Sequence, residues 1–401
     1  MAETLQAPEN RVPPLTRPSS ALRIDQDPRV HLRHLDSLFE QWSSTGAVPT
    51  GVREQVARSW QRQPATYHGA DYCPADEVAH RRAADPLLNH ASAALRERLL
   101  TSCTDTATEL VLCDSDGVVL WVAGPPNVRK RSENLGFVEG ASWTEKAVGT
   151  NALGTAMADR APVQIFGSEH SHPSHHSWVC TGAPIIDPRD ESVLGAITLS
   201  GGLRTAHPHT LSLVCSTLDA VNAELRTIHQ DGLRSRSDAA SGLLGPPGAD
   251  SLVVDGNGWV IATRGIAVSD RLFIPGGLAS GTVWIPSLGH FDANPDGDLW
   301  QLRRATRSAT SLILQAEPPC AVVSFDDREQ ATHPLTRRQF DLLRIVAAHP
   351  TGLSARELST ELYGGGDHTV TVRAEVSRIR RSLGPLLAPR PYRLTVPSIC
   401  R

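Results

Sequence analysis

The segment from Pro334 to the C-terminus most narrowly limits what this chain can fold into. Residues 336–339 (TRRQ) and 354–357 (SARE) both fit the S/T-x-x-E/Q pattern, in which paired side chains satisfy free backbone amides at a helix start. Apolar residues at helical spacing follow each pattern, and a third helix is predicted from about residue 369 to 383. Because a β-type run follows at 391–396, the segment is predicted to hold three short helices and a final strand.

The third predicted helix is basic on one side. From Pro334 onward the chain carries eleven arginines against five acidic residues, whereas the whole chain of 401 residues has a net charge of −4. Steps of about 100° per residue gather the apolar side chains on a narrow arc that is predicted to be buried. That arc holds Val372, Val376, Ile379 and Leu383, while Arg378, Arg381, Ala374 and Ser377 point outward, flanked by Arg373 and Arg380.

An exposed face of this kind suits entry into the major groove of DNA. Arginine can pair bidentately with guanine, and neighbouring basic side chains can bind phosphates. The alternative is a solvated basic face on an ordinary helix, but the two capped helices before it and the strand after it favour DNA. We therefore predict a winged helix-turn-helix over residues 326–401. Its predicted contacts with double-stranded DNA are Arg373, Ser377, Arg378, Arg380, Arg381 and Arg393.

The same segment resembles a known family of DNA-binding domains. Residues 335–343 (LTRRQFDLL), 372–384 and 392–394 (YRL) look like the winged helix of OmpR/PhoB-type response regulators. This resemblance implies a base-contacting role for Arg378. No receiver domain precedes the segment, so control by aspartyl phosphorylation is not implied. The initial four-stranded sheet of that family is not obvious, although residues 320–333 could supply a strand.

The middle of the chain follows a β-type pattern. Residues 110–113 and 118–121 are β-rich runs separated by Asp-Ser-Asp-Gly, which favours a hairpin. Further β segments are predicted at 162–166, 179–186 and 193–199, and an amphipathic helix at 208–228. An antiparallel sheet with flanking helices is the simplest α+β assembly of these elements.

This region also carries a resemblance, to the GAF sensory domain of acetoin-catabolism-type activators. The matching motifs are 140–145 (GASWTE), 149–156 (GTNALGTA), 162–166 (PVQIF), 178–180 (WVC) and 183–185 (API), preceded by the helical Ser-Trp motif at 56–62 (VARSWQR). The resemblance implies that Trp143, Glu145, Asn151 and Trp178 are the ligand-binding residues of a sensory pocket. Each has a structural alternative as a helix cap, a core aromatic or a turn residue.

Activators of that type normally continue into an ATPase. Here the only lysines are Lys130 and Lys146, so no GxxxxGK[ST] phosphate-binding loop exists in this sequence. ATP-driven remodelling of a sigma-factor complex is therefore not implied. The sensor is predicted to be joined to a different output.

These observations predict an α+β multidomain chain. The predicted parts are a proline-rich disordered tail (1–27), a helical lead-in (28–98), the GAF sensory domain (99–229), a Gly/Pro-rich linker (230–250), a small β-rich domain that is PAS-like or a spacer (251–325), and the winged helix (326–401). The small β-rich domain is predicted because residues 252–261 repeat the hairpin pattern of residues 110–121.

Signals for metal binding, catalysis and membranes are weak. The seven cysteines form no CxxC pair, and Cys180 reads as packing in a strand. The histidines of 169–176 suit a metal, but Pro173 breaks helical i,i+4 pairing, so a loop covering the pocket is favoured. No apolar run spans a bilayer and no secretory signal is evident, so a cytoplasmic protein without a membrane partner is predicted. We predict no catalytic or metal site and identify no cofactor.

The leading hypothesis is a DNA-binding transcription regulator whose GAF domain senses a small-molecule effector. The apolar stripe of the helix at 208–228 favours a homodimer. The alternative is a GAF-scaffold redox enzyme of the methionine sulfoxide reductase kind, which the spacing of Cys103, Cys113, Cys180 and Cys215 disfavours. A partner-binding scaffold is a third possibility.

Overall fold

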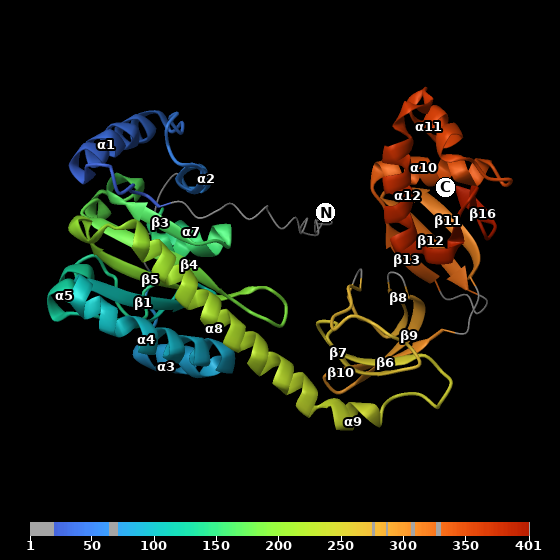
Figure 1. Ribbon diagram of the computed structural model, residues 1–401, viewed down its shortest axis with the longest axis horizontal. Coiled ribbons are helices and arrows are strands. Elements are labelled where there is room, and N and C mark those ends of the chain that lie inside the picture. Colours follow the sequence, from blue (N-terminus) through green and yellow to red (C-terminus); the bar gives the residue numbers. More distant parts are fainter. Residues whose placement is uncertain are drawn as a thin grey trace. The chain divides into compact units, whose positions relative to one another are not determined.

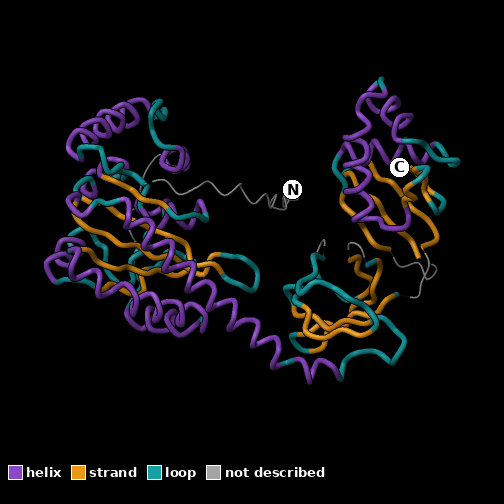
Figure 2. Tube along the Cα trace, in the orientation of Figure 1, coloured by secondary structure: helices purple, strands orange, loops and turns teal. Residues whose placement is uncertain are grey.

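The structure is a computed structural model that describes residues 20–63, 71–274, 277–285, 288–305, 309–325 and 330–400. The chain divides into two compact units, Met1–His229 and Gln230–Arg401. Both combine helices with sheets whose strands pair mostly antiparallel, so the fold class is α+β, as predicted (Figure 1, Figure 2).

Unit 1 is built on an antiparallel sheet with the strand order β2-β1-β5-β4-β3. The predicted hairpin is present: the side-chain Oδ1 of Asp114 accepts from the amides of Asp116 and Val118, both at 3.0 Å, and closes the turn. Gly117 has φ +78°, a conformation that glycine adopts without strain. The strands are β1 (Thr108–Asp114), β2 (Val119–Ala123), β3 (Val163–Phe166), β4 (Trp178–Ile186) and β5 (Val193–Gly202).

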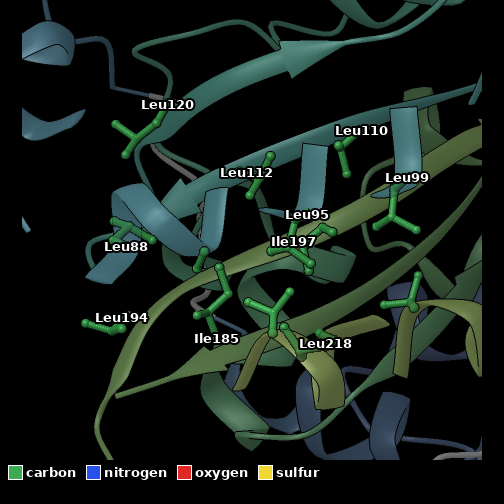
Figure 3. Packing of buried hydrophobic residues seen from close by; sticks show 14 of the residues in the cluster. Leu88, Leu95, Leu99, Leu110, Leu112, Leu120, Ile185, Leu194, Ile197 and Leu218 are labelled. Carbon is green, nitrogen blue, oxygen red and sulfur yellow. The ribbon is translucent and has the colours of Figure 1, made fainter. Parts of the chain in front are cut away.

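Both faces of this sheet are covered. All residues of β1 are buried, and because successive side chains alternate, Leu110 and Leu112 face one layer while Val111 and Cys113 face the other. The first layer is made by α4 (Pro86–Thr106) and α8 (Pro208–Ser235). Figure 3 shows this core, with leucines of α4 beside those of β1.

The apolar stripe of α8 is used inside unit 1. Leu211, Val214, Leu218, Val221 and Leu225 are all buried, and the last four belong to the core between α4 and the sheet. This removes the observation from which the homodimer was predicted, because the unit's own sheet supplies the apolar partner.

The helix α8 is also longer than predicted, and it continues through the first residues of the predicted linker. It ends at Ser235, and α9 (Ser237–Ser241) follows. Leu233 and Ala240 pack with apolar residues of β6, β7 and β10 in unit 2, which explains why residues 233–241 are helical instead of extended.

The other helices of unit 1 surround the sheet: α1 (Pro28–Thr45), α2 (Glu54–Arg62), α3 (Ala75–Ala84), α5 (Pro126–Glu133), α6 (Glu145–Val148) and α7 (Ala152–Asp159). Short 3₁₀ turns lie at η1 (Gly167–Glu169), η2 (Pro173–His175) and η3 (Leu203–Thr205). The side chain of Asp27 caps α1, and that of Asp85 caps α4. The rings of Trp42 in α1 and Trp60 in α2 stack with centroids 4.5 Å apart.

Part of the predicted disordered tail is ordered. Residues 1–19 lie outside the described residues, but Ala21 and Leu22 are buried. The amide of Ala21 donates to Oε1 of Gln164 at 2.9 Å, and its side chain packs with Leu35 and Leu38 of α1. The few apolar residues at the end of the tail therefore have a tertiary partner that composition does not reveal.

Unit 2 begins with an antiparallel sheet of order β7-β6-β10-β9-β8. Its first hairpin repeats the turn chemistry of unit 1, since Oδ1 of Asp255 accepts from the amides of Asn257 and Trp259, both at 2.9 Å. The strands are β6 (Ser251–Asp255), β7 (Val260–Arg264), β8 (Gly281–Ile285), β9 (Gly289–Asp296) and β10 (Leu299–Arg304).

A second sheet of order β13-β12-β11-β16 packs against helices at the end of the chain. It contains β11 (Ala309–Ala316), β12 (Pro319–Phe325), β13 (Gln330–Pro334) and β16 (Ser398–Cys400). Leu312, Leu314 and Val323 lie before the boundary predicted at residue 325, and they pack with the helices and not with β6–β10. Residues 320–333 supply most of two strands where the sequence indicated one.

The helices at the end of the chain start where their capping patterns place them. Both capping boxes are formed, by Thr336 with Gln339 and by Ser354 with Glu357. The elements are α10 (Arg337–Ala348), α11 (Ala355–Tyr363), η4 (Gly366–His368), α12 (Thr369–Leu383), η5 (Gly384–Leu386), β14 (Leu387–Pro389) and β15 (Tyr392–Leu394). The helix α12 has the predicted bounds.

Candidate functional site

A small cavity in unit 1 lies on the sheet face opposite α4 and α8. Its floor is formed by Thr198 and Ser200 of β5, which alternate with Ile197 and Leu199 of the core on the other face. The remaining lining residues are Ser132, Leu135, Phe137, Trp143, Asn151, Ala152, Leu153, His170, His175, Trp178 and Cys180. Three of the four predicted ligand-binding residues therefore line one cavity.

The two predicted tryptophans are deeply buried walls of this cavity, each 4% exposed. The ring of Trp143 lies 4.2 Å from that of Phe137 and stacks on His175 at 5.3 Å, and its Nε1 donates to the carbonyl of Gly136. The guanidinium of Arg131 lies 4.8 Å from the ring centre of Trp178. The tryptophans thus belong to the core and to the cavity at once.

Asn151 lines the cavity as the N-cap of α7. Its Oδ1 accepts from the amide of Gly154 and its Nδ2 donates to the carbonyl of Gly149, both at 2.9 Å. These local bonds are the helix-cap role that was the alternative to ligand binding.

Glu145, the fourth predicted ligand-binding residue, lies outside the cavity lining. Its buried carboxylate accepts from Ser59 Oγ at 2.5 Å, from Thr155 Oγ1 at 2.7 Å and from Arg62 Nε at 2.7 Å. Ser59 and Arg62 come from the Ser-Trp motif in α2. This buried charge network joins α2 to the sheet domain and occupies the carboxylate.

Two histidines of the 169–176 segment, for which the sequence favoured a loop covering the pocket, line the cavity: His170 and His175. Nδ1 of His170 lies 2.9 Å from the carbonyl of Gly167, and burial lowers the pKa of His170 to about 4. The neutral ring then donates from Nδ1 and keeps Nε2 as an acceptor. Burial lowers the pKa of His175 to about 3, and its Nδ1 has no hydrogen-bond partner among the described residues.

The histidine segment is held in place by α2 and the residue before it. Nε1 of Trp60 donates to the carbonyl of Glu169 at 3.0 Å, and Arg53 pairs with the Glu169 carboxylate at 2.7 Å. Within the described ranges, no group of three or more histidine, cysteine or acidic side chains is arranged to hold a metal ion.

A buried carboxylate, that of Glu109, is hydrogen-bonded to Ser132 in the cavity lining. Ser132 Oγ donates to Oε2 of Glu109 at 2.7 Å, whereas Oε1 has no partner in the described part of the chain. Burial raises the pKa of Glu109 to about 7 and that of Cys180 to about 12. Cys180 is therefore a thiol at neutral pH. An alternation of hydroxyl and apolar residues along 197–200 was the sequence signal for this floor.

The cavity is small and its lining carries no formal charge. About 20 Å³ is open to the centres of water molecules, which exceeds the roughly 10–15 Å³ that one water needs. None of the lining residues is acidic, lysine or arginine, and both lining histidines have lowered pKa values. Aromatic walls with a hydroxyl floor suit a small, neutral, polar molecule.

The second candidate site is the exposed surface of α12. The predicted arc of Val372, Val376, Ile379 and Leu383 is buried, and Glu375 is buried beside it. The carboxylate of Glu375 forms an ion pair with Arg378, whose side chain is 54% exposed. Arg378 thus points to solvent while tethered to its own helix.

The structure separates the predicted DNA-contacting residues into two sets. Arg373, Ser377, Arg380 and Arg381 line an open groove in unit 2, whereas Arg378 and Arg393 do not. The groove also contains residues that the sequence analysis missed, among them Trp284, Arg304 and Arg390. No local pattern marks these three, because they come from β8, β10 and the β14–β15 turn.

Parts of the chain are similar to known regulatory proteins. Residues 35–222 match the family described as MimR, N-terminal domain. AcoR, the acetoin dehydrogenase operon transcriptional activator of Bacillus subtilis, is 36% identical over 180 residues, which cover 43% of this chain and 30% of AcoR. MimR of Mycolicibacterium smegmatis, the propane 2-monooxygenase operon transcriptional activator, is 32% identical over 202 residues, which cover 50% of this chain and 34% of MimR.

Both relatives are named as transcriptional activators. The part of each relative that this chain matches is about a third of that relative's length. A relative matched over most of its length is a 47.3 kDa protein of uncharacterized activity from the thcA 5′ region of Rhodococcus erythropolis. It is 31% identical over 391 residues, which cover 94% of this chain and 72% of that protein. The chain belongs to the family of this R. erythropolis protein. In the parts that the structure describes, no helix has the length and apolar character to cross a membrane.

Proposed function

We propose that this protein is a cytoplasmic, ligand-responsive transcription regulator. In this proposal, residues 99–229 are a GAF-type sensory domain and the C-terminal part is a winged-helix DNA-binding domain. Two relatives named as transcriptional activators support the regulatory role. The observation that carries the DNA-binding role is α12, which buries one apolar arc and exposes arginines, after two helices with complete capping boxes.

The effector is a small neutral molecule with a hydrogen-bonding group. The charge-free lining of the cavity supports this, because a charged ligand would lose its hydration without an ion pair to replace it. The Nδ1 of His175, which has no partner among the described residues, can bind such a group. So can the hydroxyls of Thr198 and Ser200, which lie 3.3 Å from each other. The size of the cavity limits the ligand to a few non-hydrogen atoms unless the walls move apart.

DNA binding is tested by fluorescence anisotropy of the full chain. The probes are a labelled duplex from the region upstream of its own gene and a scrambled duplex of equal length. Tighter binding to the upstream duplex, weakened by Arg381→Ala, is the expected result. The proposal is contradicted if the wild type binds the two duplexes equally and Arg381→Ala binds each of them as tightly as the wild type does.

Effector binding is tested by thermal unfolding with a set of small neutral alcohols, ketones and diols. A ligand at a hundredfold excess over Kd should stabilise the protein by about 2.7 kcal/mol. Thr198→Val, which removes a hydroxyl from the cavity floor at nearly constant volume, should reduce the stabilisation, whereas Arg381→Ala should leave it unchanged. A shift that Thr198→Val leaves untouched places the ligand elsewhere.

The redox-enzyme alternative rests on the cysteine in the cavity wall. The reactive form of cysteine is the thiolate. Burial raises the pKa of Cys180 to about 12 and also raises the pKa of Cys113. This environment disfavours the alternative and favours a regulator. The predicted homodimer is not needed by the proposal, since the α8 stripe is already buried within unit 1.

A further inference from the structure

The basic groove of unit 2 is lined from more than one sheet and helix. Arg373, Arg380 and Arg381 come from α12, and Arg390 comes from the turn between β14 and β15. Arg304 stands at the end of β10, in the sheet whose sequence predicts a PAS-like domain or a spacer. The groove therefore gathers guanidinium groups from three separate parts of unit 2.

Four of these five arginines have no ion-pair partner among the described residues. None of the groove-lining residues is Asp or Glu. Within the described ranges, Arg304 alone of the five forms an ion pair, with Asp250 at 2.6 Å. Because like charges in one groove repel each other, such a surface is stabilised by an anion that neutralises several of them together. A phosphodiester strand, with regularly spaced charges, fits this requirement.

The two walls of the groove are joined at the end of α12. Trp284 of β8 is 5% exposed, and its Nε1 donates to the backbone carbonyl of Arg381 at 3.0 Å. Its ring lies against Gly384, where any larger residue would collide with it. The ring centroid of Trp284 is 4.7 Å from that of His290 in β9 and 5.6 Å from that of His333 in β13. The groove is thus formed before any partner arrives.

Arg304 is held in a defined orientation on its wall. Its Nε donates to Oδ2 of Asp250 and its Nη1 to the carbonyl of Leu288, both at 2.6 Å. The guanidinium lies 5.1 Å from the ring centre of Phe291, and the side chain is 41% exposed. A fixed guanidinium with unused donors loses little conformational freedom when it binds a phosphate.

We propose that the β6–β10 sheet forms a second wall of the DNA interface, in which Arg304 binds the same phosphate backbone as the arginines of α12. This inference rests on the proposed function. It assigns a role in DNA binding to the β6–β10 sheet.

The test compares two neighbouring arginines of β10 in the full chain. Arg304→Ala removes the groove-lining guanidinium, whereas Arg303→Ala removes an exposed guanidinium that does not line the groove. The probe is a labelled duplex of random sequence, because a phosphate contact is independent of sequence. Arg304→Ala should weaken binding about three- to tenfold and lower the salt slope by about one, and Arg303→Ala should change neither.

A second variant is expected to strengthen DNA binding, a result that loss of folding could not produce. Asp250→Asn removes the acidic group beside Arg304 and should tighten binding about twofold or more, because the groove gains positive charge. Unfolding measured by circular dichroism accompanies each variant. If Arg304→Ala perturbs folding, the decision passes to Asp250→Asn, where unchanged or weakened binding overturns the inference.

The remaining outcomes separate this inference from the proposed function. Equal effects of Arg304→Ala and Arg303→Ala, with Arg381→Ala still weakening binding, overturn the inference and leave the proposed function intact. Tighter binding by Arg304→Ala also overturns it, since the sheet would then shield the groove. A wild-type chain that binds no duplex overturns the proposed function itself.

Discussion

The cavity of unit 1 and the groove of unit 2 are built in contrasting ways. The cavity is lined by uncharged side chains that also belong to the core, such as Trp143 and Leu153. The charged side chains of the groove come from β10, the β14–β15 turn and above all from α12, whose separate apolar arc is buried. The binding residues of the groove can therefore be replaced without loss of the fold of unit 2. Those of the cavity cannot be replaced without disturbing the core of unit 1.

This difference teaches how each site can respond to its partner. A cavity that is part of the core couples occupancy to the packing and stability of the whole unit. A surface groove contributes affinity through charge and is sensitive to salt. A sensor benefits from the first property and a DNA-binding surface from the second. Four predictions follow this contrast, from the largest expected change in free energy to the smallest.

Trp143→Ala should lower the free energy of unfolding of unit 1 by about 3–5 kcal/mol, because it leaves a large void in the core. Arg381→Ala, a surface change on α12, should alter stability by no more than about 0.5 kcal/mol. Urea denaturation followed by circular dichroism measures both. A cost below about 1 kcal/mol for Trp143→Ala would break the contrast, because the cavity wall would then be separable from the core.

Glu109→Gln should make the stability of unit 1 less dependent on pH. Burial raises the pKa of Glu109 from 4.5 to about 7, so the folded state favours the protonated carboxyl. The wild type then loses about 3 kcal/mol of stability as the pH rises from below 4.5 to above 7. The neutral amide removes this loss.

Urea denaturation at two pH values checks the Glu109 prediction. The variant should be more stable than the wild type by up to about 3 kcal/mol at pH 8 and by less than about 1 kcal/mol at pH 5. Glu97→Gln, at an exposed carboxylate on α4, is the control and should show no such trend. A constant difference between Glu109→Gln and the wild type would contradict the assignment.

Arg378→Ala should cost about 1–3 kcal/mol of binding to a specific duplex and relax preference at one base pair. Arg380→Ala should instead weaken binding to every duplex and lower the salt slope by about one. Anisotropy with specific and scrambled duplexes across a salt series distinguishes the two. Equal losses on both duplexes for both variants would reduce α12 to a general basic surface.

Trp284→Phe should have the smallest effect, a loss of about 0.5–1.5 kcal/mol in the stability of unit 2. It keeps an aromatic ring at the contact with Gly384 but removes the hydrogen bond to the carbonyl of Arg381. Chemical denaturation of the full chain measures the loss. An unchanged stability would indicate that this hydrogen bond does not hold the groove walls together.

Much of the local structure could be predicted, and the errors share one cause. The turn at Asp114 and the helix starts at Thr336 and Ser354 depend on side chains a few residues away, and all are present. Glu145 was assigned to the pocket because of its motif, yet its partners Ser59 and Arg62 are more than 80 residues away in sequence. No short pattern encodes such a contact.

The same distinction holds for the larger elements. Residues up to 325 were predicted to belong to the small β-rich domain, but the sheet that β11 and β12 join depends on which apolar surface they meet. The stripe of α8 likewise predicted an apolar partner without saying whether that partner was a second copy or the sheet of unit 1. Periodicity defines which face is buried and is the same for every possible partner.

The sequence by itself determined the elements with local causes: the two Asp-x-x-Gly hairpins, the two capping boxes, the bounds of α12 and the arc that it buries. Only the tertiary structure decided where the cavity lies, that the carboxylate of Glu145 binds Arg62 of α2, and that Arg304 of β10 lines the same groove as α12. Local features arise from hydrogen bonds and steric preferences within a few residues, whereas a site arises where distant segments pack, and packing depends on all of their surfaces together.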